Sequence, residues 1–136
     1  MEPQIRALRN DLKTLVLSHP TVQDVHIRGE ESTATRGYLR TRLALQSRDE
    51  VEVVVYLIEE GGVVRLQEYS LHWQRRDGAL IQRWDTAPHH PELATFPPHT
   101  HRATGEVEPA AAFDWNSLIT FLQREIFAIS VQKPDT

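Results

Sequence analysis

The sequence predicts an α+β domain: an antiparallel β-meander of about five strands, flanked by an N-terminal and a C-terminal helix. Apolar residues recur at helical spacing near both ends of the chain, whereas between residues 22 and 86 they alternate with a period of two. Two turn signals, Gly61-Gly62 and Asp77-Gly78, separate successive alternating runs. Because such short turns join neighbouring antiparallel strands, we expect a meander.

Helices are predicted at residues 4–17 and 114–129. Pro3 suits the start of the first helix, and His19-Pro20 ends it. Asp114 is a suitable N-cap for the second helix. Its apolar residues then follow at helical intervals: Trp115, Leu118, Ile119, Leu122 and Ile126.

The region between the helices divides into a sheet, residues 22–86, and an irregular segment, residues 87–109. The alternating runs of the sheet are 25–27, 39–45, 51–58, 64–74 and 79–85. The irregular segment contains five prolines and no hydrophobic period, so we expect a loop rich in His and Pro that carries active-site residues.

Length and composition limit the class of protein. The 136 residues fit a single domain, 1–136, and carry a net charge of −4, so we expect any site for a polyanion to be local. The absence of cysteine excludes disulfides, cysteine-ligated zinc and thiol catalysis. We also expect a cytoplasmic protein without membrane contact, because the chain has no long apolar run and no signal-peptide pattern at its start.

The predicted hairpin at Asp77-Gly78 brings polar residues together. A two-residue turn there places His72 opposite Arg83 and Ser70 opposite Asp85. Because side chains alternate along a strand, these four share one face of the sheet. The other face then receives Leu71, Trp73 and Trp84.

Four of the seven histidines follow closely after this hairpin. The candidate catalytic residues are therefore His72, Arg83, Asp85, His89, His90, His99 and His101. Two histidines can act as general base and general acid near neutral pH, and an arginine can stabilise charge on a phosphoryl group. We expect Asp85 to orient a histidine or to anchor the loop. Candidates for substrate contact are Ser70, Trp73 and Trp84, although both tryptophans also fit the core.

Two other interpretations remain open at this point. The loop histidines and Asp85 could bind zinc or another transition metal and form a metal-dependent nuclease, although their spacing matches no standard metal motif. The same loop could instead belong to a non-catalytic module that binds a nucleotide or an antitoxin. We assign no role to the isolated His19 and His26.

Residues 69–101, YSLHWQRRDGALIQRWDTAPHHPELATFPPHTH, resemble the TumE-type toxins of prokaryotic toxin–antitoxin systems. The family pattern is approximately Tyr-Ser-Tyr-His-Trp-Gln, Arg-x-Asp-Asn-Ala-Pro-His-His and Phe-Pro-His-His-x-His. All seven candidate catalytic residues match it, whereas Leu71, Thr86 and Pro98 depart from it. The resemblance implies an α+β protein that acts on RNA-type phosphodiesters and has an antitoxin as partner.

From this resemblance and the residues together we expect a ribonuclease-type phosphodiesterase that needs no metal or other cofactor. The substrate's own 2′-OH would attack the adjacent phosphate. Similar folds are recruited as ring nucleases beside type III CRISPR systems, so the substrate is either RNA or a cyclic oligoadenylate. A homodimer would cover a free edge of the expected sheet.

Overall fold

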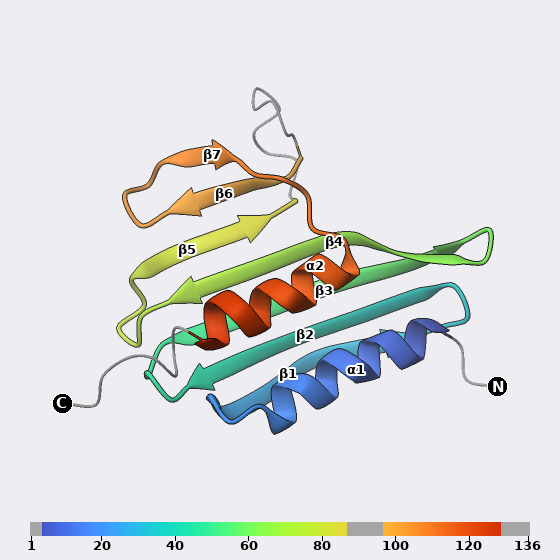
Figure 1. Cartoon of the computed structure of the whole chain (residues 1–136), viewed down its shortest axis with the longest axis horizontal. Helices are drawn as coiled ribbons and strands as arrows, with labels where there is room; N and C mark the ends of the chain where they lie inside the picture. Colours follow the sequence, from blue (N-terminus) through green and yellow to red (C-terminus); the bar gives the residue numbers. More distant parts are fainter. Residues whose placement is uncertain (1–3, 87–96, 129–136) are drawn as a thin grey trace.

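The computed structural model describes residues 4–86 and 97–128. These residues contain a single antiparallel sheet of seven strands, arranged in sequence order from β1 to β7 (Figure 1). The strands are β1 (Val22–Ser32), β2 (Arg36–Leu45), β3 (Glu50–Glu60), β4 (Val63–Gln74), β5 (Leu80–Asp85), β6 (His99–Arg102) and β7 (Val107–Pro109). The α+β meander is therefore confirmed, with seven strands in place of about five.

The two additional strands lie within the segment that we predicted to be a loop, residues 87–109, so that prediction is wrong for β6 and β7. β6 reads HTHR and has no apolar alternation by which it could be recognised. It pairs with β5 on one side and with β7 on the other. Gly105, at φ 90°, allows the short loop between β6 and β7. His89 and His90 lie outside the described residues.

The helices are α1 (Gln4–Ser18), α2 (Trp115–Phe121) and the π-helical η1 (Leu122–Phe127). Asp114 is the N-cap as predicted: its Oδ1 accepts from the Ser117 amide at 2.7 Å, and Ser117 Oγ accepts from the Asp114 amide at 2.9 Å. The predicted C-terminal helix is confirmed, and its second half, η1, is π-helical. The wider turn of η1 relates residues five apart, and both Leu122 and Phe127 are buried.

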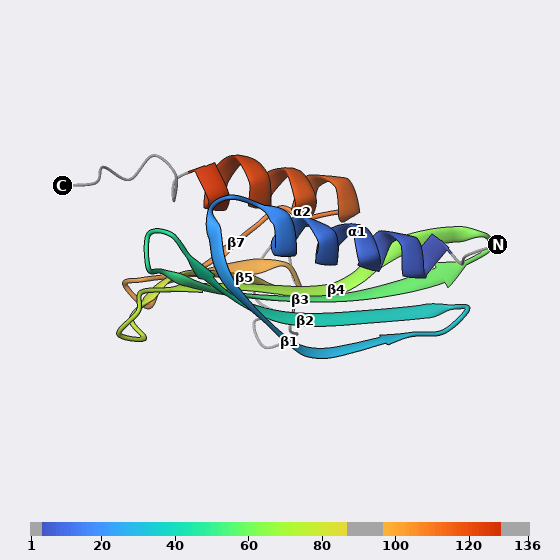
Figure 2. The same cartoon turned by 90° about the horizontal axis from the view of Figure 1, so that it is seen from below.

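Both helices lie on one face of the sheet (Figure 2). Between helices and sheet is the core, which includes Leu12, Val16, Leu39, Leu43, Val53, Leu71, Leu118, Ile126 and Phe127. We call the other side of the sheet the open face. It carries the even-numbered residues of β2 and β3, and those of β4 from Glu68 onward, as the alternation of burial shows. No helix in residues 4–86 and 97–128 is sufficiently long and apolar to span a lipid bilayer.

The hairpin of β4 and β5 has the predicted register, but not the predicted turn. His72 is opposite Arg83 and Ser70 is opposite Asp85. The Gly78 amide donates to the carbonyl of Arg75 at 2.9 Å, and the Arg75 amide donates to that of Ala79 at 2.8 Å, so the loop has three residues. A register shift between Trp73 and Gln74 inserts one extra residue, Ile81, and compensates for the longer turn.

Candidate functional site

Neighbouring strands β4, β5 and β6 carry the candidate residues on the open face. His72 of β4 is opposite Arg83 of β5, which is opposite His101 of β6. In the next open-face row, Asp85 of β5 is opposite His99 of β6. We refer to these five residues as the histidine cluster.

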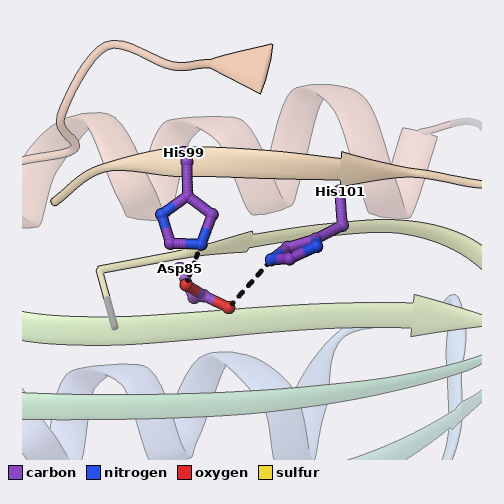
Figure 3. Close-up of side chains that lie close together, drawn as sticks. All are labelled: Asp85, His99 and His101. Atoms are coloured by element: carbon purple, nitrogen blue, oxygen red, sulfur yellow. Dashed lines mark ion pairs between the residues drawn. The ribbon is translucent and has the colours of Figure 1, made fainter. Parts of the chain in front are cut away.

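Asp85 lies at the centre of the histidine cluster and is buried. Its Oδ2 accepts a hydrogen bond from Arg83 Nε at 2.6 Å, and its Oδ1 is 2.8 Å from His99 Nε2. His101 Nε2 lies 3.8 Å from Oδ2, so both histidines approach the same carboxylate (Figure 3). Burial makes this arrangement energetically important, because a buried carboxylate is costly unless cations or donors surround it.

Each ring nitrogen of His99 lies within hydrogen-bond distance of an oxygen atom. This side chain is fully buried, and its Nδ1 is 2.6 Å from the carbonyl oxygen of Pro97. A carbonyl only accepts hydrogen bonds, so Nδ1 must donate. Nε2 faces Asp85 Oδ1, and an ionised carboxylate also only accepts. Both ring nitrogens of His99 therefore face oxygen atoms that can accept hydrogen bonds, and His99 forms a buried pair with Asp85.

His72 has the opposite pattern of hydrogen bonds. Its Nδ1 lies 3.2 Å from Arg83 Nη1, which can only donate, so Nδ1 accepts. Gln74 Nε2 donates to Glu50 Oε2 at 3.1 Å, which turns Gln74 Oε1 toward His72 Nε2 at 3.0 Å. In this arrangement Nδ1 of His72 accepts from Arg83 and Nε2 donates to Gln74. The guanidinium of Arg42 donates to Glu50 and holds the pKa of that carboxyl below its usual value.

A shallow pocket of about 220 Å³ opens on this face beside the histidine cluster. It is lined by Arg42, Glu50, Glu52, His72, Gln74 and Arg83. Of these, the sequence had not singled out Arg42, Glu50, Glu52 or Gln74. The alternation from Ser70 to His72 continues to Gln74 and was a usable signal for it.

The remaining predicted contact residues divide between the two faces. Ser70 is opposite Asp85 on the open face. Trp73 Nε1 donates to Asp49 Oδ2 at 3.3 Å, and the ring of Trp84 packs edge-on against Phe121 of α2, with centroids 4.9 Å apart. Both tryptophans pack against the core on the face opposite the histidine cluster, so their placement offers no support for contact with substrate there.

Three members of the histidine cluster also form a set of ligands that could hold a metal ion. One atom each of Asp85, His99 and His101 lies within 4.8 Å of the others. Two imidazoles and a carboxylate suit zinc and other transition metals. The Pro97 carbonyl on His99 Nδ1 resembles the backbone acceptor that usually orients a metal-bound histidine. A metal at this position would replace the proton on His99 Nε2.

Comparison with known proteins identifies one family. The family described as toxin TumE matches residues 12–130, a range that includes the whole histidine cluster and most of the chain. No curated protein and no solved structure matches the chain.

Proposed function

The chain belongs to the TumE toxin family and so has a toxin role, and we propose that it exerts this role as a metal-independent, ribonuclease-type phosphodiesterase. Family membership also implies an antitoxin partner. The observation that carries the proposal is the row formed by His72, Arg83 and His101 across three neighbouring strands.

This row suits in-line cleavage of a phosphodiester. Adjacent strands lie about 4.8 Å apart, so the backbones of His72 and His101 lie about 10 Å apart with Arg83 between them. A phosphate bound over the guanidinium would have one imidazole on each side. General base and general acid would then approach the attacking and leaving oxygens from opposite sides, and Arg83 would stabilise the charge that develops on phosphorus oxygens.

The hydrogen bonds suggest how the two roles divide. Nδ1 of His72 accepts from Arg83 and becomes available when Arg83 turns from it to the phosphate, so we assign His72 as the base that accepts the 2′-OH proton. The 2′-oxygen attacks phosphorus, and the bond from phosphorus to the 5′-oxygen breaks. His101, partly exposed beside Asp85, donates a proton to that 5′-oxygen. The products are a 2′,3′-cyclic phosphate and a 5′-hydroxyl.

Asp85 and His99 would act as positioning residues in this scheme. His99 is fully buried and so does not face substrate in this arrangement. The ion pair of His99 and Asp85 holds the carboxylate that fixes Arg83 Nε at 2.6 Å, and the same carboxylate stabilises a protonated His101.

The test is to incubate purified protein, in EDTA, with an unstructured RNA and with cyclic tri-, tetra- and hexa-adenylate, and to identify the products. We expect cyclic-phosphate ends, and no cleavage where a 2′-deoxy nucleotide precedes the scissile bond. His72→Ala and His101→Ala should each slow cleavage by about 10²–10⁴-fold. His26→Ala, at the opposite edge of the sheet, is the matched control. Undiminished cleavage by both site variants would exclude the scheme, and binding without turnover would favour a non-catalytic module.

A metal-dependent nuclease is the second candidate, because Asp85, His99 and His101 place three ligand atoms within 4.8 Å of one another. In that case EDTA abolishes cleavage, a divalent metal restores it, and metal analysis of the purified protein finds an ion that His99→Ala loses. Full activity in EDTA, with no metal in the protein, excludes this candidate.

A further inference from the structure

Two tyrosines form an aromatic patch on the open face, away from the histidine cluster. Tyr38 of β2 is opposite Tyr56 of β3, and their ring centroids lie 4.8 Å apart with an angle of 32° between the rings. Tyr56 is 40% exposed. Neither ring belongs to the core, which is on the other side of the sheet.

The backbone beneath the pair accommodates the ring of Tyr38. A Cβ atom on Gly29 of β1 would lie 3.0 Å from Tyr38 Cε1, so a larger residue there would force the ring to shift. Burial, and then Tyr38 and Glu68, raise the pKa of Tyr56 and keep its hydroxyl protonated near neutral pH. The two rings thus form an uncharged aromatic surface, and the tyrosine hydroxyls at its edge can donate hydrogen bonds.

The tyrosine pair and the histidine cluster occupy one continuous face. Tyr56 is four residues from Glu52 along β3, or about 13 Å, and Glu52 is two strand spacings, about 10 Å, from Arg83. Arg40 lies between Tyr38 and the pocket on β2 and is 46% exposed. Its guanidinium donates to Glu52 at 3.1 Å and has further N–H groups that can face a phosphate. A single strand that enters the histidine cluster can therefore reach the tyrosines within a few nucleotides.

We propose that Tyr38 and Tyr56 stack nucleobases of a single-stranded RNA whose phosphodiester is cleaved at Arg83. The inference rests on the proposed function and specifies its substrate as a linear strand that extends from the cleavage site. Aromatic side chains stack any base, so the platform selects single strands rather than a sequence. Arg40 and Arg42 are paired with Glu52 and Glu50, so we expect stacking to contribute more to binding than phosphate contacts do, and the salt dependence of binding to be shallow.

Binding is measured separately from cleavage, with a fluorescent 2′-O-methyl hexanucleotide that lacks the attacking hydroxyl. Tyr38→Ala and Tyr56→Ala should each raise its Kd by about 5-fold to 100-fold. The Phe variants retain stacking and should bind as the wild type does. Leu17→Ala removes an apolar side chain that is 59% exposed on α1, at the opposite face, and is the matched control.

The two proposals fail on different results. An RNA dinucleotide is too short to reach the tyrosines, so both Ala variants should cleave it at the wild-type rate while cleaving the hexanucleotide RNA with a raised KM. Wild-type affinity in both Ala variants, or equal losses in the Phe and Ala variants, would overturn the stacking platform. Tight binding of the 2′-O-methyl strand through the tyrosines, without cleavage of the RNA form, supports the platform and overturns the nuclease assignment alone.

Discussion

Two aspartate–histidine pairs lie at opposite regions of the sheet and have the same chemical groups. On β1, His26 Nε2 is 3.4 Å from Asp24 Oδ2, and the two side chains are 72% and 65% exposed. Between β5 and β6, His99 Nε2 is 2.8 Å from Asp85 Oδ1, and the side chains are 0% and 2% exposed. The first pair is solvated, whereas the second is enclosed and shares its carboxylate with Arg83 and His101.

The difference shows that burial, rather than residue type, separates an incidental ion pair from a structural one. Water screens the exposed pair on β1, and such pairs contribute little to folding stability. The pair on β5 and β6 has lost its water, so each charge depends on the groups that replace it. Both pairs consist of the same two residue types, and the packing distinguishes them.

The largest expected effect comes from removing the charge on the buried carboxylate. Asp85→Asn removes the carboxylate that His99 and Arg83 share, and removing one partner of a buried ion pair costs about 3–5 kcal/mol. We expect the free energy of unfolding in urea to fall by this amount at pH 7. Asp24→Asn, the control on β1, should unfold at the wild-type urea concentration. Equal urea midpoints for the two variants would show that the buried pair contributes no more to stability than the exposed pair does.

A smaller effect is expected from a change in the shape, but not the charge, of Arg83. Its Nε contacts Asp85 while its other guanidinium nitrogens can donate to a phosphate, an arrangement that the single ammonium of a lysine cannot reproduce. Arg83→Lys should therefore lower kcat for RNA by about 100-fold while the fold remains intact. Arg102→Lys alters a solvated pair with Glu108 and should cleave at the wild-type rate. A fully active Arg83→Lys variant would show that only the charge of Arg83 matters.

The smallest effect concerns His19, a third kind of histidine, which packs on the ring of Phe127 and accepts from the Thr21 amide through Nδ1. Burial lowers its pKa from 6.5. The folded state therefore disfavours protonated His19, so its contribution is complete above pH 6.5 and is lost as pH falls through 6.5 toward the folded pKa. The wild type should lose thermal stability over this range, and His19→Gln should lose less. Parallel pH profiles of Tm would contradict this.

Part of the site could be predicted from sequence because alternation determines which residues share a face. His72, Arg83 and Asp85 were placed together correctly. The turn used to derive their register was wrong, however, by one residue. The extra residue at Ile81 cancelled that error, and local turn chemistry gives no information about such a bulge.

The opposite outcome occurred between β3 and β4. Gly61 and Gly62 form the expected two-residue turn, both with positive φ. A register shift after Tyr56 then moves the pairing by one residue, and this shift places Glu52 opposite His72. A regular ladder from the same turn would have placed Glu52 opposite Leu71, on the other face. The position of Glu52 in the pocket therefore could not be predicted from the sequence.

The strand β6 was missed for a different reason. It has no apolar alternation, because His99 and His101 face a carboxylate on the open face and Thr100, opposite Trp84, is also polar. Hydrophobic periodicity detects strands that bury apolar side chains, and a strand stabilised by an ion pair gives no such signal. The strand that completes the histidine cluster is thus one that hydrophobic periodicity does not detect.

The simple order of the meander determines how late in synthesis the histidine cluster can be completed. Every strand pairs with its neighbour in sequence, so the sheet can grow one hairpin at a time as the chain leaves the ribosome. β1 to β4 and α1 can associate early, but His99 and His101 join only when β6 docks on β5. The ring contact of Trp84 in β5 with Phe121 also forms only after α2 has been synthesised. A nascent chain therefore completes the histidine cluster only after β1 to β5 have been synthesised.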